Sequence, residues 1–133
     1  MITETIGKCL DFFEIDGSYI QIDFKNYQAL RRKDRGVYVL AHGDSVVYVG
    51  RGYIRDRQEK HWQKALNDLK PGTIDPKGWK WFRENHDVKP DEWQLWSISL
   101  ARETELSAME GSLIHLLQPL ANDETFKDRG LMG

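Results

Sequence analysis

The sequence predicts one α+β domain in which a small, largely antiparallel β-sheet is flanked by helices. Residues 36–50 consist of two short β-like runs around the polar turn His42-Gly43-Asp44-Ser45, which is the pattern of an antiparallel hairpin. Two later stretches, 53–69 and 104–117, repeat apolar residues at the spacing of one helix face. With 133 residues, of which 40% are hydrophobic, the chain is long enough for one domain around one core.

The composition excludes several classes of protein. The single cysteine, Cys9, excludes an intramolecular disulfide and a cysteine zinc cluster. No apolar run approaches the length of a membrane span, and residues 1–17 lack the basic start and apolar core of a signal peptide. We therefore expect a soluble, intracellular protein of the cytoplasm with no membrane partner.

The distribution of charge is more informative than the net charge of −2. Residues 31–35 and 51–64, on either side of the hairpin, together carry +6, and the remainder of the chain carries −8. Two basic clusters in an otherwise acidic protein indicate a local anion site. A pair of solvated charged faces is the simpler explanation of the charge runs alone.

The segment before the hairpin is expected to add a helix and a strand. A short amphipathic helix is predicted from the spacing of four residues, Ile6, Cys9, Leu10 and Phe13. After a turn at 16–18, residues 19–24 alternate polar with apolar side chains and are predicted to form a strand.

Within the hairpin, period-two alternation assigns side chains to the two faces of the sheet. In the first strand it separates Tyr38 and Leu40 from Val37, Val39 and Ala41. In the second strand it separates Val46 and Tyr48 from Val47 and Val49. Gly50-Arg51-Gly52 breaks the pattern, so the strand is expected to end there.

The helix after the hairpin is predicted to run from about residue 53 or 56 to Leu69. Arg57, His61 and Lys64 form a polar strip along its edge, and Arg57 and His61 are adjacent because they are four residues apart. The remaining predictions are a linker with a short helix over 75–88, a strand over 93–100, a helix over 104–117 and a frayed tail over 123–133.

One residue of the last helix does not fit its apolar periodicity. Glu110 falls inside the arc formed by five apolar side chains, Leu106, Met109, Leu113, Leu116 and Leu117. Burying a carboxylate without a partner destabilises a fold by an amount on the order of several kcal/mol. Glu110 is therefore expected to meet a metal or an arginine, or to reach solvent from the edge of the arc.

Gly36-Val37-Tyr38 and Tyr48-Val49-Gly50 resemble the paired motif that names the GIY-YIG nucleases. The resemblance continues in order through Arg57 and His61 (R-x-x-x-H), through Glu110 to Ile114 (E-x-x-L-I), and through Pro119 to Asn122 (P-x-x-N). Arg51 stands where several members carry a lysine. The match covers roughly residues 35–122 and implies the small mixed sheet of that family.

The chain departs from the family pattern in three places. The loop between Gly50 and Arg57 is one residue shorter than in many members, so Arg55 competes with Arg57 for the arginine position. Residues 71–92 are longer than in a minimal module, and the first 34 residues have no counterpart. We therefore expect a GIY-YIG-like nuclease domain over 35–122, an N-terminal extension over 1–34 packed on its core, and a tail over 123–133.

The resemblance implies a metal-dependent endonuclease that cuts or nicks DNA. Glu110 would be the ligand of one divalent ion, Mg²⁺ or Mn²⁺, which water and phosphate oxygens would complete. Tyr48 would position or deprotonate the attacking water, and Arg51 and Arg57 are expected to lower its pKa from about 10. Tyr38 would hold the scissile phosphate or the water network.

The remaining site residues are assigned to phosphate and to orientation. Arg57 would grip phosphate oxygens, which suits a planar guanidinium, and His61 would bind phosphate or share the proton transfer. Asn122 would orient Glu110 or the metal-bound waters. Further phosphate contacts are expected from Arg51, Arg55 and Lys64.

Two other classes of function remain open from the sequence. A nucleic-acid-binding module would keep the fold without catalysis, and an unrelated α+β interaction protein would make the hairpin a coincidence. In the second case the tyrosines fill the sheet, Arg57 and His61 form a solvated strip, and Asn122 holds a turn. The sequence does not separate repair, restriction, mobile-element and viral roles, and a homodimer would explain double-strand cutting by a subunit with one site.

Overall fold

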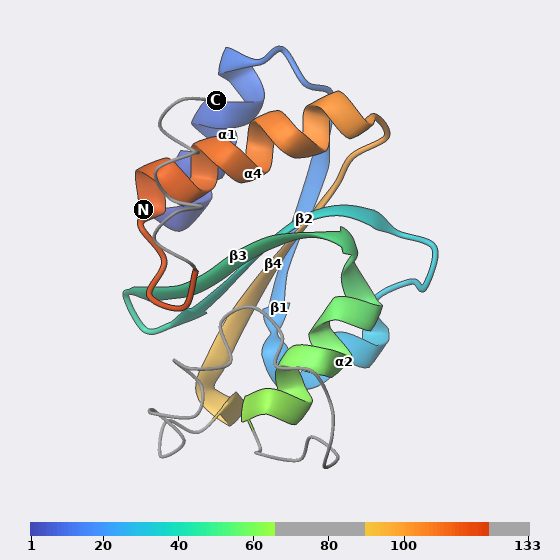
Figure 1. The fold of residues 1–133 in the computed structure, drawn as a ribbon, viewed down its shortest axis with the longest axis vertical. Helices are drawn as coiled ribbons and strands as arrows, with labels where there is room; N and C mark the ends of the chain where they lie inside the picture. Colours follow the sequence, from blue (N-terminus) through green and yellow to red (C-terminus); the bar gives the residue numbers. More distant parts are fainter. Residues whose placement is uncertain (66–89, 123–133) are drawn as a thin grey trace.

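The computed structural model describes residues 1–65 and 90–122, which form an α+β fold around a four-stranded antiparallel sheet (Figure 1). The strands lie in the order β1-β4-β2-β3, with bounds Ser18–Asp23 for β1, Trp93–Ser99 for β4, Arg35–His42 for β2 and Ser45–Tyr53 for β3. This confirms the predicted fold class. It also makes β1 and β3 the two edge strands.

Helices cover both faces of this sheet. On one face α1 (Ile2–Phe12) lies beside α4 (Glu103–Leu117), and the other face is covered by α2 (Ile54–Ala65) and the 3-10 helix η1 (Phe24–Ala29) (Figure 1). A short 3-10 turn, η2 (Pro90–Glu92), leads into β4. The sheet thus separates two apolar cores, one against α1 and α4 and one against α2 and η1.

The predicted elements are largely confirmed within the part of the chain that the structure describes. The segment 1–34 supplies α1 and the edge strand β1, which pairs with β4. The helix after the hairpin begins at Ile54. Three other predictions lie outside the described residues: the continuation of this helix to Leu69, the linker with a short helix at 75–88, and the tail at 123–133. Within 1–65 and 90–122, no helix has the length and apolar character needed to cross a membrane.

A β-bulge in the hairpin breaks the alternation predicted for the second strand. Leu40 pairs with Tyr48 and Ala41 pairs with Val46, so Val47 is an extra residue in the ladder. As a result Val46 and Val49 are buried on the side of α1 and α4, while Val47 and Tyr48 lie on the side of α2. The predicted face assignment of this strand is wrong, because the bulge shifts the register by one residue.

The strand β3 also continues through Gly50 and Gly52, where it was expected to end. These glycines pair with Tyr38 and Gly36, and the strand runs on to Tyr53. Gly50 of β3 and Gly36 of β2 allow close packing: a Cβ at Gly50 would lie 2.4 Å from the Tyr38 hydroxyl oxygen, and one at Gly36 would lie 1.8 Å from the Ile98 carbonyl oxygen.

Substituting alanine for Gly36 should destabilise the fold strongly, because the backbone of β4 leaves no space for a Cβ there. We expect a loss of about 3 kcal/mol or more in the free energy of unfolding. Chemical denaturation of Gly36→Ala and of Gly7→Ala measures the difference. Gly7 lies within α1 with nothing near its Cβ position, so alanine there should stabilise by up to about 1 kcal/mol. Equal stability of the two variants would contradict the close approach of β2 and β4.

Candidate active site

Three aromatic rings meet between the sheet and α2. The Tyr38 hydroxyl and the His61 Nε2 atom are hydrogen-bonded at 2.7 Å, and both side chains are buried. Tyr48 completes the cluster, with its ring centroid 4.6 Å from that of His61 and 6.2 Å from that of Tyr38. Two residues from the hairpin and one from the following helix therefore form a single packed unit.

Local backbone structure explains why these rings meet. Tyr38 is opposite Gly50 in the ladder and Tyr48 is opposite Leu40, so the two tyrosines lie diagonally on one face. The absence of a side chain at Gly50 leaves room for both rings, because a Cβ there would also lie 2.8 Å from Tyr48 Cε1. Since α2 begins directly after β3, its second turn carries His61 over this face.

Arg57 lies on α2 beside the aromatic cluster. Its side chain passes over Gly52, where a Cβ would lie 3.1 Å from Arg57 Nε. The positive charge of Arg57 acts on both tyrosines, lowering the pKa of each hydroxyl against larger opposing effects. Arg55, the competing arginine of the sequence pattern, lies on the first turn of α2 and is partly exposed. The structure thus places Arg57 next to the tyrosines.

Burial has the largest effect on the acidity of the two tyrosines. It raises the pKa of Tyr48 to about 12, with a further increase from the Glu110 carboxylate that the Arg57 guanidinium only partly offsets. The pKa of Tyr38 is raised well above its ordinary value by burial and by Tyr48, with a further contribution from Glu110. Arg57 lowers the pKa of Tyr48, as the sequence predicts, but the pKa is raised overall because desolvation disfavours the phenolate more strongly.

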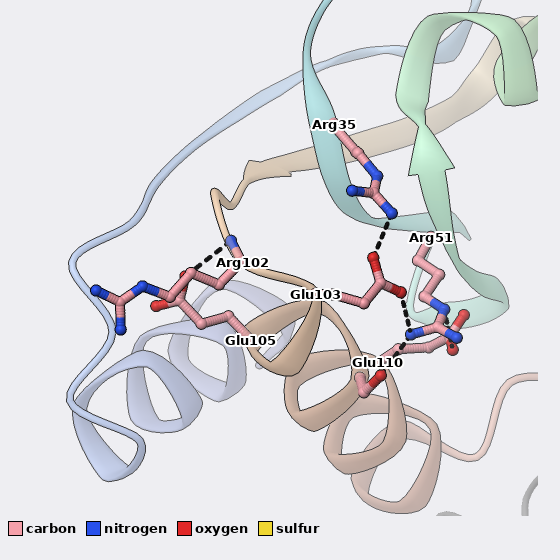
Figure 2. Close-up of polar contacts among 7 residues, drawn as sticks. Arg35, Arg51, Arg102, Glu103, Glu105 and Glu110 are labelled. Atoms are coloured by element: carbon pink, nitrogen blue, oxygen red, sulfur yellow. Dashed lines mark hydrogen bonds and ion pairs between the residues drawn. The ribbon is translucent and has the colours of Figure 1, made fainter.

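Glu110 reaches this cluster from the opposite layer of the fold. It lies on α4, is 8% exposed, and raises the pKa of both tyrosines. Because β3 is an edge strand, groups from the two faces can approach one another around it. The side chain of Arg51 on β3 contacts α4, with its Nε atom 3.5 Å from Glu110 Oε1 (Figure 2). The predicted buried carboxylate is present, and one of its partners is an arginine.

The residues near Glu110 suit a hard cation that is held mainly by water and substrate. Within 1–65 and 90–122 there is no group of three His, Cys, Asp or Glu side chains that would enclose a metal ion. Mg²⁺ is commonly held by one or two carboxylates and completed by waters and phosphate oxygens. A single, nearly buried carboxylate therefore fits Mg²⁺ or Mn²⁺ with bound phosphate and does not fit a structural zinc ion.

Asn122 bonds to the backbone of the edge strand. Its Oδ1 atom accepts a hydrogen bond from the Val49 amide, and its Nδ2 atom donates one to the Val49 carbonyl, both at 2.9 Å. The backbone amides of Leu120 and Ala121 donate in the same way to Val46 and Val47. The segment after α4 therefore covers the outer edge of β3. The predicted role of Asn122 toward Glu110 or metal-bound water stays a prediction.

Several residues of the site were not found from the sequence. Glu103 and Ser107 both contact Arg51, and with Glu110 they occupy successive turns along one side of α4. Their spacing of four and then three residues was a readable signal.

Gln58 is fully buried on α2, and neither of its amide atoms has a hydrogen-bond partner among the described residues. Of the predicted phosphate ligands, the Lys64 side chain lies outside the described part of the chain.

Comparison of the chain with protein-family models, curated proteins and solved structures gave no match.

Replacing Asn122 by alanine should destabilise the protein by about 1–3 kcal/mol, because the amide and carbonyl of the buried Val49 lose their partners. The Val49 amide should also exchange with solvent faster than in the unmodified protein. Chemical denaturation and amide hydrogen exchange measure both effects. Leu120→Ala, at a side chain that is 52% exposed, is the control and should have little effect. Unchanged exchange at Val49 in Asn122→Ala would contradict this role of the side chain.

Alkaline titration should show that the Tyr48 hydroxyl ionises at a higher pH than an ordinary tyrosine. Absorbance at the phenolate band should reveal a group with a pKa of about 12 that disappears in Tyr48→Phe. Since the folded-state pKa exceeds the unfolded value of about 10, Tyr48 stabilises the fold fully below pH 10, and this contribution is lost as the pH rises toward 12. Glu110→Gln should lower the Tyr48 pKa, because it removes a negative charge that raises it. A late group that persists in Tyr48→Phe and is unmoved in Glu110→Gln would contradict the assignment.

Proposed function

We propose that this chain is a metal-dependent endonuclease that hydrolyses or nicks phosphodiester bonds in DNA. The observation that carries the proposal is the convergence of five predicted residues at the β3 edge. Tyr38 and His61 are hydrogen-bonded, Tyr48 packs on His61, and the charges of Arg57 and Glu110 act on both hydroxyls. Phosphodiester hydrolysis needs these group types together: a polar group for water, a cation for phosphate and a carboxylate for a metal ion.

In the proposed reaction the chain binds and orients the phosphate and the attacking water. Arg57 is exposed on α2 and binds phosphate oxygens through its planar guanidinium. Tyr48 keeps its proton at neutral pH, since its pKa is about 12, so it positions the water through its hydroxyl group. Tyr38 is held in place by its hydrogen bond to His61, and in this proposal His61 binds phosphate or shares the proton transfer.

Glu110 would hold the divalent cation, Mg²⁺ or Mn²⁺. The bound ion would supply electrostatic stabilisation of the charge that develops on the phosphoryl oxygens. Arg51 lies next to Glu110, which supports a further phosphate contact from its guanidinium. Arg55 is two residues from Arg57 on α2 and so lies on a different side of the helix, and its predicted phosphate contact stays a prediction. The resemblance to the GIY-YIG nucleases supports the same assignment. By this proposal the protein acts inside the cell, in the cytoplasm, and a homodimer would allow both strands to be cut.

A second function is favoured by one contact. Arg51 already supplies positive charge to Glu110, so the carboxylate has a protein partner without any metal ion. This arrangement suits a nucleic-acid-binding module that keeps the fold and has lost cleavage. Measurement of cleavage and of DNA binding separates the two functions.

Cleavage should require a divalent cation and the residues of the β3 edge. Supercoiled plasmid and single-stranded DNA are incubated with the protein, with and without Mg²⁺ or Mn²⁺. Glu110→Gln, Tyr48→Phe and Arg57→Ala should each lower the rate by about 10²-fold or more, because each removes a group that contacts the reacting phosphate, the water or the cation.

Control variants change charge at exposed positions away from the site. Glu59→Gln on α2 and Lys25→Ala on η1 should cleave at the wild-type rate. Thermal unfolding verifies that each variant is folded. Unchanged cleavage by Glu110→Gln would refute the metal-site assignment, and DNA binding without cleavage by the unmodified protein would favour the binding module.

A further inference from the structure

A network of charged residues joins α4 to the hairpin beside the candidate site (Figure 2). Glu103 contacts two arginines: its Oε2 atom pairs with Arg35 of β2, and its Oε1 atom lies 3.2 Å from Nη1 of Arg51. The same Nη1 atom donates a hydrogen bond of 2.5 Å to Ser107 Oγ. On its other side, Arg51 Nε lies 3.5 Å from Glu110 Oε1. Arg51 is therefore shared between an outer and an inner carboxylate.

The two carboxylates differ in their exposure to solvent. The side chain of Glu103 is 56% exposed, whereas that of Glu110 is 11% exposed. Ionic interactions are screened more weakly in the less exposed position, so the charge of Arg51 has its larger effect on Glu110. A nearly buried carboxylate also needs compensating positive charge more than an exposed one does.

These contacts set Arg51 in competition with any cation on Glu110. A divalent ion at Oε1 and the guanidinium at 3.5 Å are both positive, so each disfavours the other. The contacts to Glu103 and Ser107 are made by Nη1, a different nitrogen of the guanidinium from the Nε that lies next to Glu110. They hold Arg51 when its contact with Glu110 is weakened, and so reduce the cost of displacing it.

We propose that Arg51 is a built-in competitor of the divalent cation at Glu110, and that Glu103 sets the strength of this competition as a positioning residue. The inference rests on the proposed function and adds to it a control of cation affinity. Without the cation, Arg51 compensates the charge of Glu110. With the cation bound, Glu103 and Ser107 retain Arg51 next to the site, where its guanidinium is available to a phosphate oxygen.

Binding of Mn²⁺ without DNA tests this inference independently of cleavage. Isothermal titration calorimetry, or the electron paramagnetic resonance signal of free Mn²⁺, gives the dissociation constant. Arg51→Met should bind Mn²⁺ roughly tenfold more tightly, since it removes a positive charge next to the ligand. Glu103→Gln should bind Mn²⁺ about threefold more weakly. The positive charge of Arg51 is then no longer partly neutralised by Glu103, and one negative charge near the cation is lost.

The double variant separates positioning from long-range charge. If Glu103 acts through Arg51, Glu103→Gln should have a smaller effect in the Arg51→Met background than in the unmodified protein. Glu59→Gln and Lys60→Met make the same charge changes on exposed positions of α2 and should leave the dissociation constant unchanged. Thermal unfolding of every variant verifies that the native fold is retained.

The possible failures are distinguishable from failure of the proposed function. Unchanged Mn²⁺ affinity in Arg51→Met, or an equal effect of Glu103→Gln in both backgrounds, overturns this inference even if cleavage depends on Glu110. Equal Mn²⁺ binding by Glu110→Gln and by the unmodified protein places the cation elsewhere. That outcome overturns both the inference and the metal site of the proposed function.

Discussion

The candidate site depends on the close packing of Tyr38 against the backbone of β3 at Gly50. With no Cβ at that position, the Tyr38 ring lies across the neighbouring strand and its hydroxyl reaches His61 at 2.7 Å. The same space accommodates Tyr48, so both rings are held by the sheet and by α2. This packing buries the hydroxyls, and burial is the main reason for the raised pKa of each tyrosine. Geometry and acidity in this site therefore have a common cause.

Because β3 is an edge strand, residues from the helical layers on both faces of the sheet can contribute to a site beside it. One face of the strand carries Tyr48, and the other side of the sheet is covered by α4 with Glu110 (Figure 1). An exposed strand edge is normally open to pairing with another chain. Here residues 120–122 cover part of that edge through backbone bonds and the Asn122 side chain. The segment after α4 thus stabilises the strand on which the site is built.

Charge around the site is balanced by protein groups from both layers. Arg57 and Glu110 act in opposite directions on the tyrosines, and Arg51 connects Glu110 to Glu103 and Ser107. Most of these groups are partly exposed, so each pair alone contributes little to stability. Their importance lies in where they hold charge: a nearly buried carboxylate and the Arg57 guanidinium both act on the two tyrosines. Such an arrangement suits the binding of a cation together with an anionic substrate.

The sequence by itself determined the elements and much of the site, because periodicity and motif spacing are local properties. Residue patterns predict the hairpin, a helix that begins at about 53 or 56, a helix over 104–117 and the anomalous position of Glu110. The structure has these two helices beginning at Ile54 and Glu103. Only the tertiary structure decided the bulge at Val47, the continuation of β3 through Gly50 and the partners of Asn122, since each depends on a segment distant in sequence. The acidity of Tyr48 is likewise decided by folding: Arg57 is visible in the sequence, but the desolvation that outweighs its charge arises only when the Tyr48 ring is buried against His61 of α2.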